Sequence, residues 1–342
     1  MSLKNVIISY CFALYYGLIV CAHVFWKWLK NPSKNVFAVK ERPEPPPCLL
    51  DPAYGSHCYV TVNGIKIHYV EKGDKSKPLM LFLHGFPEFW YSWRYQIKEF
   101  SKDYWTVAMD MRGYGDSDKP SGIHNYQVKY LVDDVVKVIE ALGREKCVLV
   151  SHDWGGAVGW TMLAVHPEKL ERYVVMNAPP GSVFSKLLAT NKAQFRKSWY
   201  MFFYLLPILP ELFIRSWDMK IFDRVFKKKT SNTPTVTEED IEAFKYTFSK
   251  EGAFTGPLNY YRAFIRGVGT SSSLKRKPVE DPPRGLFLFG EKDDFIELVV
   301  VEMAEKSIKN LSTKIVKDAN HFVQQDEPVI VNKLMRDFLN EK

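Results

Sequence analysis

The sequence has few cysteines, and none is spaced like a metal ligand or a redox pair. There are five in 342 residues, an odd number, and no two form a Cys-x-x-Cys pair. This usage is typical of a protein in a reducing compartment and argues against a disulfide framework. The cysteines are Cys11, Cys21, Cys48, Cys58 and Cys147.

The sequence also lacks the features of nucleic-acid-binding, repeat and low-complexity proteins. The formal net charge is +8, but no basic stripe interleaved with aromatic residues is found, so nucleic acid is not expected as a partner. No internal repeat or low-complexity tract is apparent. With 46% hydrophobic and 25% charged residues, the chain is globular and long enough for one large or two ordinary domains.

One long stretch near the N-terminus lacks charged side chains altogether. Residues 6–26 contain no Asp, Glu, Lys or Arg, and a helix of that length crosses about 30 Å of hydrocarbon. A cleavable signal peptide is the alternative, but its apolar core would be about 7 to 15 residues long and would precede a small-residue cleavage site. The aromatic, basic segment at 24–28 is more typical of a membrane interface. We therefore predict an uncleaved transmembrane anchor over residues 5–28.

The charges around this segment indicate its orientation. Lys4 lies on one side, whereas several basic residues, Lys27 and Arg42 among them, lie on the other. By the positive-inside rule the part of the chain after the anchor is cytosolic. We expect the anchor to cross the membrane of the endoplasmic reticulum once. Residues 29–54 then form a linker, in which the proline-rich run at 42–47 is a stiff, extended spacer that holds the protein off the membrane.

The sequence after the linker alternates strands and helices. A hairpin is predicted over 57–70, because Asn63-Gly64 provides the positive φ values of a tight two-residue turn. Buried strands separated by helices follow, a pattern that builds a mostly parallel, helix-covered sheet. The predicted strands of this part are 79–83, 106–109 and 147–150, with helices near 91–100 and 126–142.

A long insertion interrupts this alternation. About a hundred aromatic, helix-like residues separate the strand at 173–176 from the one at 285–289, too many for a loop, which indicates an inserted helical cap. A last strand at 313–316 and a helix at 327–339 complete the core. We place the first part of the core at 55–180, the cap at 181–278 and the second part of the core at 279–342.

The segment from Ser151 to Gly156 lies between a predicted strand and a predicted helix and has the form of a nucleophile elbow. Such a turn lifts one side chain above the sheet, on a strained backbone where only small neighbours fit. The residue at this position is Asp153. A carboxylate attacks an sp3 carbon and becomes an ester, so we expect alkyl transfer to water rather than acyl transfer. The alternative is that Asp153 only caps the helix.

A base and an orienting acid follow at the next strand ends. His321 lies after the last predicted strand, and Asp293 follows the strand before it. Nucleophile, acid and histidine thus occur in the chain order of α/β-hydrolases. In this arrangement His321 would activate water against the ester, and Asp293 would orient the His321 ring. Asp294 is an alternative to Asp293 that spacing does not resolve.

His84-Gly85-Phe86-Pro87 also follows a predicted strand, at the place where such folds supply the first oxyanion-hole amide. We expect the N–H groups of Phe86 and Trp154 to hold the oxyanion that forms when water attacks the ester. We also expect the bond between Phe86 and Pro87 to be cis. A simple Gly-Pro turn is the alternative interpretation.

Together these segments resemble the epoxide hydrolases of the α/β-hydrolase superfamily, and with its anchor the chain is most similar to the animal epoxide hydrolase 3 and 4 branch. The resemblance runs from about residue 55 to the C-terminus. It implies the α/β-hydrolase fold, which is a mostly parallel eight-stranded sheet with flanking helices and an inserted helical cap, here preceded by a transmembrane helix. The motifs that carry it lie at 84–87, 110–117, 152–156 and 290–293.

The resemblance further implies that two cap tyrosines protonate the epoxide oxygen. Tyr200, in Ser-Trp-Tyr-Met-Phe, matches the first tyrosine segment of the family, and Tyr261 matches the second. Phenols are neutral at about pH 7 yet acidic enough to donate to a developing alkoxide. The neighbouring Tyr204 and Tyr260 are alternatives. Met201 departs from the polar amide found there in mammalian soluble epoxide hydrolase, which leaves the substrate contacts open.

The predicted activity is conversion of an apolar epoxide, such as a fatty-acid epoxide, to a vicinal diol through a covalent hydroxyalkyl ester on Asp153. No metal and no organic cofactor is needed for this chemistry. Haloalkane dehalogenases share the Asp, the neighbouring Trp and the His, so a dehalogenase is the first alternative. A non-catalytic, lipid-binding member of the fold is the second. The cap tyrosines favour the epoxide hydrolase, since dehalogenases hold halide with indole or amide donors.

Overall fold

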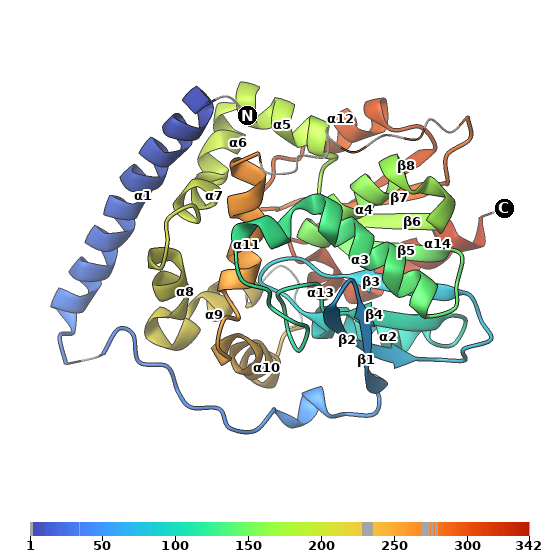
Figure 1. The fold of residues 1–342 in the computed structure, drawn as a ribbon, viewed down its shortest axis with the longest axis horizontal. Helices are drawn as coiled ribbons and strands as arrows, with labels where there is room; N and C mark the ends of the chain where they lie inside the picture. The colour runs from blue at the N-terminus through green and yellow to red at the C-terminus, as the bar shows by residue number, and fades with distance from the viewer. Residues whose placement is uncertain are drawn as a thin grey trace.

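An eight-stranded sheet forms the centre of the molecule, with helices on both faces and a helical cap beside it (Figure 1). The computed structural model describes residues 3–33, 35–227, 235–267, 274, 277 and 280–341. β2 pairs antiparallel with β1 and β4, and all other neighbouring strands are parallel. The strand order is β1-β2-β4-β3-β5-β6-β7-β8. Their bounds are β1 Ser56–Val62, β2 Ile65–Lys72, β3 Leu79–Leu83, β4 Trp105–Met109, β5 Cys147–His152, β6 Leu170–Met176, β7 Gly285–Gly290 and β8 Leu311–Val316.

The direction of each crossover explains which helix covers which face. From β3 the chain runs through α2 (Arg94–Phe100) to β4, then through α3 (Val128–Ala141) back across the sheet to β5. Right-handed crossovers in opposite directions place α2 and α3 on opposite faces. The crossovers through α4 (Asp153–Val165) and α12 (Val300–Ser307) run in the same direction as the one through α3, so these helices lie on the same face as α3. On the other face, α14 (Pro328–Asn340) packs against α2. The ends of β3 and β5 meet where the direction reverses, which is where open sheets of this kind bind ligands.

The central strands are apolar on both faces. β3, β4, β5 and β7 are buried along their whole length, because helices cover both sides of the sheet. Leu81, Val107 and Leu149, for example, expose no surface. Burying a side chain of this size contributes about 1.5 to 3 kcal/mol. The predicted hairpin turn is also present, with φ values of +53° at Asn63 and +71° at Gly64.

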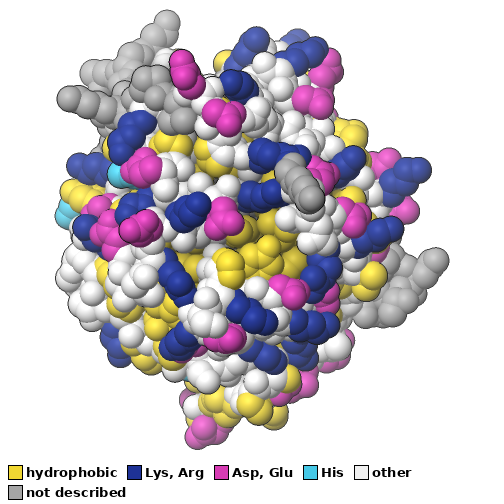
Figure 2. All heavy atoms as spheres, turned by 90° about the vertical axis from the view of Figure 1, so that its right-hand side faces the viewer, with side chains coloured by type: hydrophobic (Ala, Val, Ile, Leu, Met, Phe, Trp, Pro, Cys, Tyr) yellow, Lys and Arg dark blue, Asp and Glu magenta, His cyan; other side chains and the backbone are white. Residues whose placement is uncertain are grey.

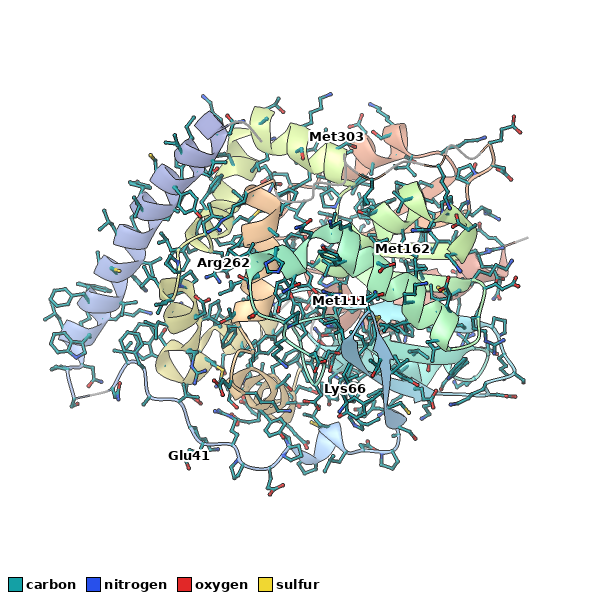
Figure 3. All side chains as sticks on the ribbon, viewed as in Figure 1. Glu41, Lys66, Met111, Met162, Arg262 and Met303 are labelled. Atoms are coloured by element: carbon teal, nitrogen blue, oxygen red, sulfur yellow. The ribbon has the colours of Figure 1, made fainter. Side chains whose placement is uncertain are left out.

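The cap consists of the helices between β6 and β7. Arg262 ties its parts together, because the guanidinium donates to the carbonyl oxygens of Tyr204 and Leu206 and pairs with Glu211 at 2.9 Å (Figure 3). The predicted end of the cap at residue 278 lies outside the described residues. The cap helices are α5 Gly181–Thr190, α6 Lys192–Lys197, α7 Trp199–Phe203, α8 Leu209–Met219, α9 Ile221–Phe226, α10 Glu238–Ser249 and α11 Thr255–Ile265.

The N-terminal helix α1 (Leu3–Lys30) lies along the outer side of the cap (Figure 1). Ala13 is fully buried there, and the ring of Phe12 meets the edge of Phe195. On the opposite side of the helix, Leu18 is 72% exposed. Within the described part of the chain, α1 is the one helix long and apolar enough to cross a membrane. It therefore has the length and composition of a membrane anchor or a signal sequence.

The linker after α1 is extended, as its prolines predict, but it lies against the cap. The Arg42 guanidinium pairs with Asp218 at 2.7 Å and with Glu242 at 3.0 Å, which accounts for this path. Farther along, the Cys48 N–H donates to the Glu239 carboxylate of α10. The linker then enters β1, so it acts as a strap between cap and core (Figure 1).

The surface opposite α1 carries charges of both signs. Lys and Arg side chains alternate there with Asp and Glu around small apolar patches (Figure 2). The net charge of +8 is therefore not gathered on this face into a patch of one sign.

Candidate active site

Asp153 is the first residue of α4 and directly follows β5. Its φ is +47°, in the left-handed region, where a non-glycine residue costs about 1 to 3 kcal/mol. The neighbours must be small: a Cβ on Gly155 would lie 2.2 Å from the Leu83 carbonyl oxygen, and one on Gly85 would lie 2.4 Å from the Asp153 Cβ. This strained turn is the elbow that the sequence predicts, and it presents the Asp153 carboxyl at the end of the sheet.

The His321 ring lies between two carboxylates. Its Nδ1 is 2.8 Å from Asp293 Oδ2, and its Nε2 is 3.6 Å from Asp153 Oδ2. Asp294 faces elsewhere, because its carboxylate accepts a hydrogen bond from the Asn320 side chain at 2.8 Å. The structure thus brings Asp293, and not Asp294, to the histidine.

The Asp293 carboxylate is held by several donors. Oδ1 accepts the N–H groups of Phe295 and Ile296, and Oδ2 accepts the Asn177 amide at 2.7 Å in addition to His321. Burial opposes ionisation of Asp293, but the charge and hydrogen bond of His321, with these donors, lower its pKa. The acid is therefore ionised and fixed in direction.

Asn177 is part of this arrangement although no sequence motif predicts it. It directly follows β6, is fully buried and has a φ of +43°. Its Oδ1 accepts the Gly290 N–H at 3.2 Å, so it joins the ends of β6 and β7. The one signal that the sequence offers is the position of Asn177 at the end of β6, the strand that lies between the nucleophile strand β5 and the acid strand β7.

The charges of Asp153 and His321 stabilise each other. Burial opposes ionisation of Asp153, but the hydrogen bonding and charge of His321, the charge of His152 and the Phe86 N–H lower its pKa. Burial also disfavours the His321 cation, yet Asp293 and Asp153 raise its pKa to about 10. Before reaction, His321 is a cation between two carboxylates.

His152 contacts the backbone of the loop that carries His321. Its Nδ1 is 2.6 Å from Glu88 Oε2, and its Nε2 is 2.8 Å from the His321 carbonyl oxygen. Glu88 accepts three further N–H groups, so it acts as an ionised acceptor. These two contacts fix the position and direction of the His152 ring between Glu88 and the backbone of His321. Neither Glu88 nor His152 has a role that spacing alone predicts.

The two predicted oxyanion-hole amides lie at the elbow. The Phe86 N–H donates to Asp153 Oδ1 at 2.8 Å, and the bond between Phe86 and Pro87 is cis, as expected. Trp154 is the second residue of α4, so its N–H has no acceptor within the helix. The Phe86 N–H therefore already contacts the carboxyl group on which the oxyanion would form, and the Trp154 N–H belongs to the next residue along the chain.

Three cap tyrosines, Tyr200, Tyr260 and Tyr261, line the same cavity as Asp153. Tyr200 of α7 and Tyr261 of α11 line this cavity, which has a volume of about 960 Å³, and their ring centroids are 5.9 Å apart. Burial first, and then the charge of Asp153, raise the pKa of both phenols. Both hydroxyls therefore stay protonated and can donate.

The neighbouring tyrosines are placed differently. The Tyr260 hydroxyl donates to the Arg112 carbonyl oxygen at 2.7 Å, so it is engaged in the core. Tyr204 stacks its edge against Tyr261 outside the set of residues that line the cavity. The structure thus places the predicted pair, Tyr200 and Tyr261, in the wall of the cavity that Asp153 also lines.

The cavity is lined mainly by apolar side chains. From Asp153 it extends along α4 past Trp160 to Pro167, with Phe184 of α5 and Phe264 of α11 on its walls. Met201 also lines it, at the position where the sequence departs from the family pattern. Such a space favours an apolar ligand considerably larger than the reacting group.

Comparisons with known proteins agree with this geometry. Residues 78–328 match the α/β hydrolase fold family. Human epoxide hydrolase 4 is 40% identical over 97% of this chain and 92% of its own length, and Xenopus tropicalis epoxide hydrolase 3 is 41% identical over 90% and 84%. The chain belongs to the epoxide hydrolases. The resemblance to the epoxide hydrolase 3 and 4 branch and the predicted fold class are both confirmed.

A solved structure of an epoxide hydrolase relative shares this architecture. A mutant of the Bacillus megaterium epoxide hydrolase, in complex with its naphthyloxy-propanediol product, has a TM-score of 0.74 and 33% sequence identity to this chain. The match covers 83% of this chain and 100% of that one. These relatives favour epoxide hydrolysis over the dehalogenase alternative.

Proposed function

We propose that this epoxide hydrolase converts an apolar epoxide to a vicinal diol through a covalent hydroxyalkyl ester on Asp153. One observation carries the proposal: Asp153 lines a cavity together with the neutral phenols of Tyr200 and Tyr261, and its carboxylate lies beside a histidine that a second carboxylate orients. The apolar lining supports a hydrophobic substrate such as a fatty-acid epoxide.

In the first step, an Asp153 oxygen bonds to an epoxide carbon and the carbon–oxygen bond of the ring breaks. The released oxygen takes a proton from Tyr200 or Tyr261, which line the same cavity. The product is a neutral hydroxyalkyl ester and one tyrosinate.

Esterification then changes the state of His321. Asp153 loses its negative charge, and with it one of the two carboxylates that raise the His321 pKa. The pKa of His321 falls, and the proton it gives up restores the phenol. His321 becomes a neutral base while Asp293 keeps it in place at 2.8 Å.

In the second step, neutral His321 takes a proton from water as the water attacks the ester carbonyl carbon. The N–H groups of Phe86 and Trp154 hold the resulting oxyanion. Collapse of this intermediate breaks the bond to the alkyl oxygen, which takes the proton from His321. Asp153 is left as a carboxylic acid and gives its proton to His321, so the carboxylate and the histidine cation of the resting enzyme are both restored as the diol leaves.

Trapping the ester tests this scheme. His321→Gln should form the ester but not hydrolyse it, so mass spectrometry of the protein after exposure to a lipid or aryl epoxide should show an adduct of the substrate mass on the Asp153 peptide. Asp153→Ala should show no adduct and no diol. Diol formation at the wild-type rate in either variant would contradict the proposal.

We also propose that residues 5–28 anchor the enzyme as a single pass in the endoplasmic reticulum, with the catalytic part in the cytosol. The mean hydropathy of 1.8 over an 18-residue window within Asn5–Lys30 supports the anchor, and the basic residues that follow it support this orientation. Since α1 lies along the cap, a helix that crosses the bilayer has to leave this contact. In intact microsomes, protease should remove a C-terminal tag, whereas a protected tag would contradict the cytosolic orientation.

A further inference from the structure

Three hydrogen bonds in series join the linker to the core. The Leu49 carbonyl oxygen is 2.9 Å from His57 Nε2, His57 Nδ1 is 2.9 Å from His68 Nε2, and His68 Nδ1 is 2.7 Å from Asp110 Oδ2. The two ring planes differ by only 23°. Figure 3 labels Lys66, two residues before His68, which helps to locate this series.

Strand pairing places the two histidines together. β1 and β2 pair so that Tyr59 lies opposite His68 and His57 lies opposite Val70. His57 and His68 are therefore diagonal neighbours on one face of the hairpin, within reach of each other. His68 is fully buried, whereas His57 lies at the surface.

The three hydrogen bonds need one more proton than two neutral imidazoles supply. A neutral imidazole has one N–H and one acceptor nitrogen. The Leu49 carbonyl oxygen can only accept, so His57 Nε2 carries a proton and its Nδ1 is left as an acceptor. If Asp110 is ionised, His68 Nδ1 carries a proton and its Nε2 is also left as an acceptor. Two lone pairs would then face each other at 2.9 Å.

Asp110 is ionised and cannot supply the missing proton. Its carboxylate also accepts the N–H groups of Trp90 at 2.8 Å and Asp116 at 3.0 Å. Burial opposes ionisation, but the hydrogen bond and charge of His68, with smaller contributions from His84 and Trp90, lower the pKa of Asp110 to about 2. The one proton that two neutral imidazoles lack is therefore held by the His57 and His68 rings.

His84 shows the ordinary case in the same molecule. Its Nδ1 donates to the Gly85 carbonyl oxygen, and its Nε2 accepts the Met111 N–H. One proton satisfies both contacts, so a neutral ring is sufficient there.

We propose that His57 and His68 together bind one extra proton, and that this proton fastens the linker to the core. The linker is attached to the cap through Arg42 and Cys48. The proton-bound pair is the next attachment along the chain, on the core side. When the proton leaves, one of the three hydrogen bonds is lost, and the junction between cap and core loosens.

The charges that face the pair are few. Asp110, which directly follows β4, is in direct contact, and its neighbour Asp116 pairs with Lys250 of the cap at 2.6 Å. β1 contributes the Tyr59 ring, whose centroid is 5.0 Å from that of His68. The Lys66 ammonium lies 4.0 Å from the centroid of the Tyr59 ring. The helix η2 (Trp90–Trp93) contributes an indole ring beside His57, and the linker contributes a carbonyl group. The carboxylate of Asp110 thus balances the extra proton.

Imidazole ¹⁵N NMR of the full-length protein tests the protonation directly. An ordinary histidine loses its proton near pH 6.5, so it is mostly neutral at about pH 7.5. At that pH we expect one imidazolium shared by His57 and His68, assigned by the loss of its signals in His57→Gln. Two neutral rings at that pH would overturn the proposal.

A comparison of stabilities tests the fastening. The folded chain holds a proton that unfolded histidines release near pH 6.5, so the stabilisation is complete below that pH and is lost as the pair deprotonates at higher pH. The melting temperature of His57→Gln should therefore fall below that of wild type near neutral pH, and the difference should shrink in alkali. Amide exchange of residues 47–50 should follow the same trend.

His124→Gln is the matched control, because His124 is exposed and lies in another element, the short helix η3 (Ile123–Tyr126). Its melting temperature should differ from that of wild type by an amount that does not depend on pH. A pH-independent difference for His57→Gln as well would show that the hydrogen bonds act without an extra proton, and would overturn the proposal.

Discussion

The His321 pKa must fall when Asp153 is esterified, and Asp153→Asn mimics that neutral state. In wild type the His321 Nε2 is 3.6 Å from Asp153 Oδ2. Two unit charges at this distance, at an effective dielectric constant of about 20, interact by about 4 to 5 kcal/mol. Each 1.4 kcal/mol, roughly, is a tenfold change in proton affinity. Asp153→Asn should therefore weaken proton binding at His321 about a thousandfold and bring its pKa from about 10 toward neutrality.

Histidine NMR titration of wild type and Asp153→Asn measures this change. Asp294→Asn is the matched control, since Asp294 contacts Asn320 rather than the ring and should have a much smaller effect. Stability gives a second measure: the raised pKa of His321 stabilises the fold fully below about pH 6.5, and this contribution is lost as the pH rises toward about 10. The loss should be smaller in Asp153→Asn. An unchanged His321 titration in Asp153→Asn would refute the idea that esterification creates the base.

Three further changes test other parts of the site. Tyr200→Phe and Tyr261→Phe should each slow ester formation in single-turnover assays, and the double variant should lose about 10² to 10⁴-fold in rate. Tyr260→Phe should retain the wild-type rate, because its hydroxyl is engaged in the core. Equal losses of rate in all three single variants would contradict this assignment. Asn177→Ala should lower the free energy of unfolding by about 2 to 4 kcal/mol in denaturant titration, because a buried charged acceptor and a buried N–H lose their partner; a change under about 0.5 kcal/mol would contradict this. Gly155→Ala should yield little folded protein by circular dichroism, since its Cβ would lie 2.2 Å from a carbonyl oxygen; a wild-type melting curve would argue against the tight elbow.

Local features of the chain were predictable because their causes are local. Asn63-Gly64 predicts its turn because few residue pairs adopt two positive φ values in succession. The continuous apolar runs predict strands covered on both faces, and the elbow motif predicts the strained position of Asp153. Chain order then places acid and histidine at successive strand ends, which meet at one edge of a parallel sheet.

Only the tertiary structure decides between neighbours and between distant partners. Asp293 and Asp294 are adjacent, and it is the direction of each side chain that turns one toward His321 and the other toward Asn320. Asn177 has no motif, since its role depends on where β6 ends relative to β7.

The same limit applies to the linker and to the histidine pair. Prolines predict an extended segment, but its path follows from the ion pairs of Arg42 with cap residues about 180 to 200 positions away in sequence. His57 and His68 meet because of the hairpin register, and the proton between them is required only once Leu49 and Asp110 occupy the outer nitrogens. The amino-acid sequence by itself determined the reacting groups and the strand ends that carry them. Folding decided the directions of the side chains, because these depend on contacts between segments that are far apart in the chain.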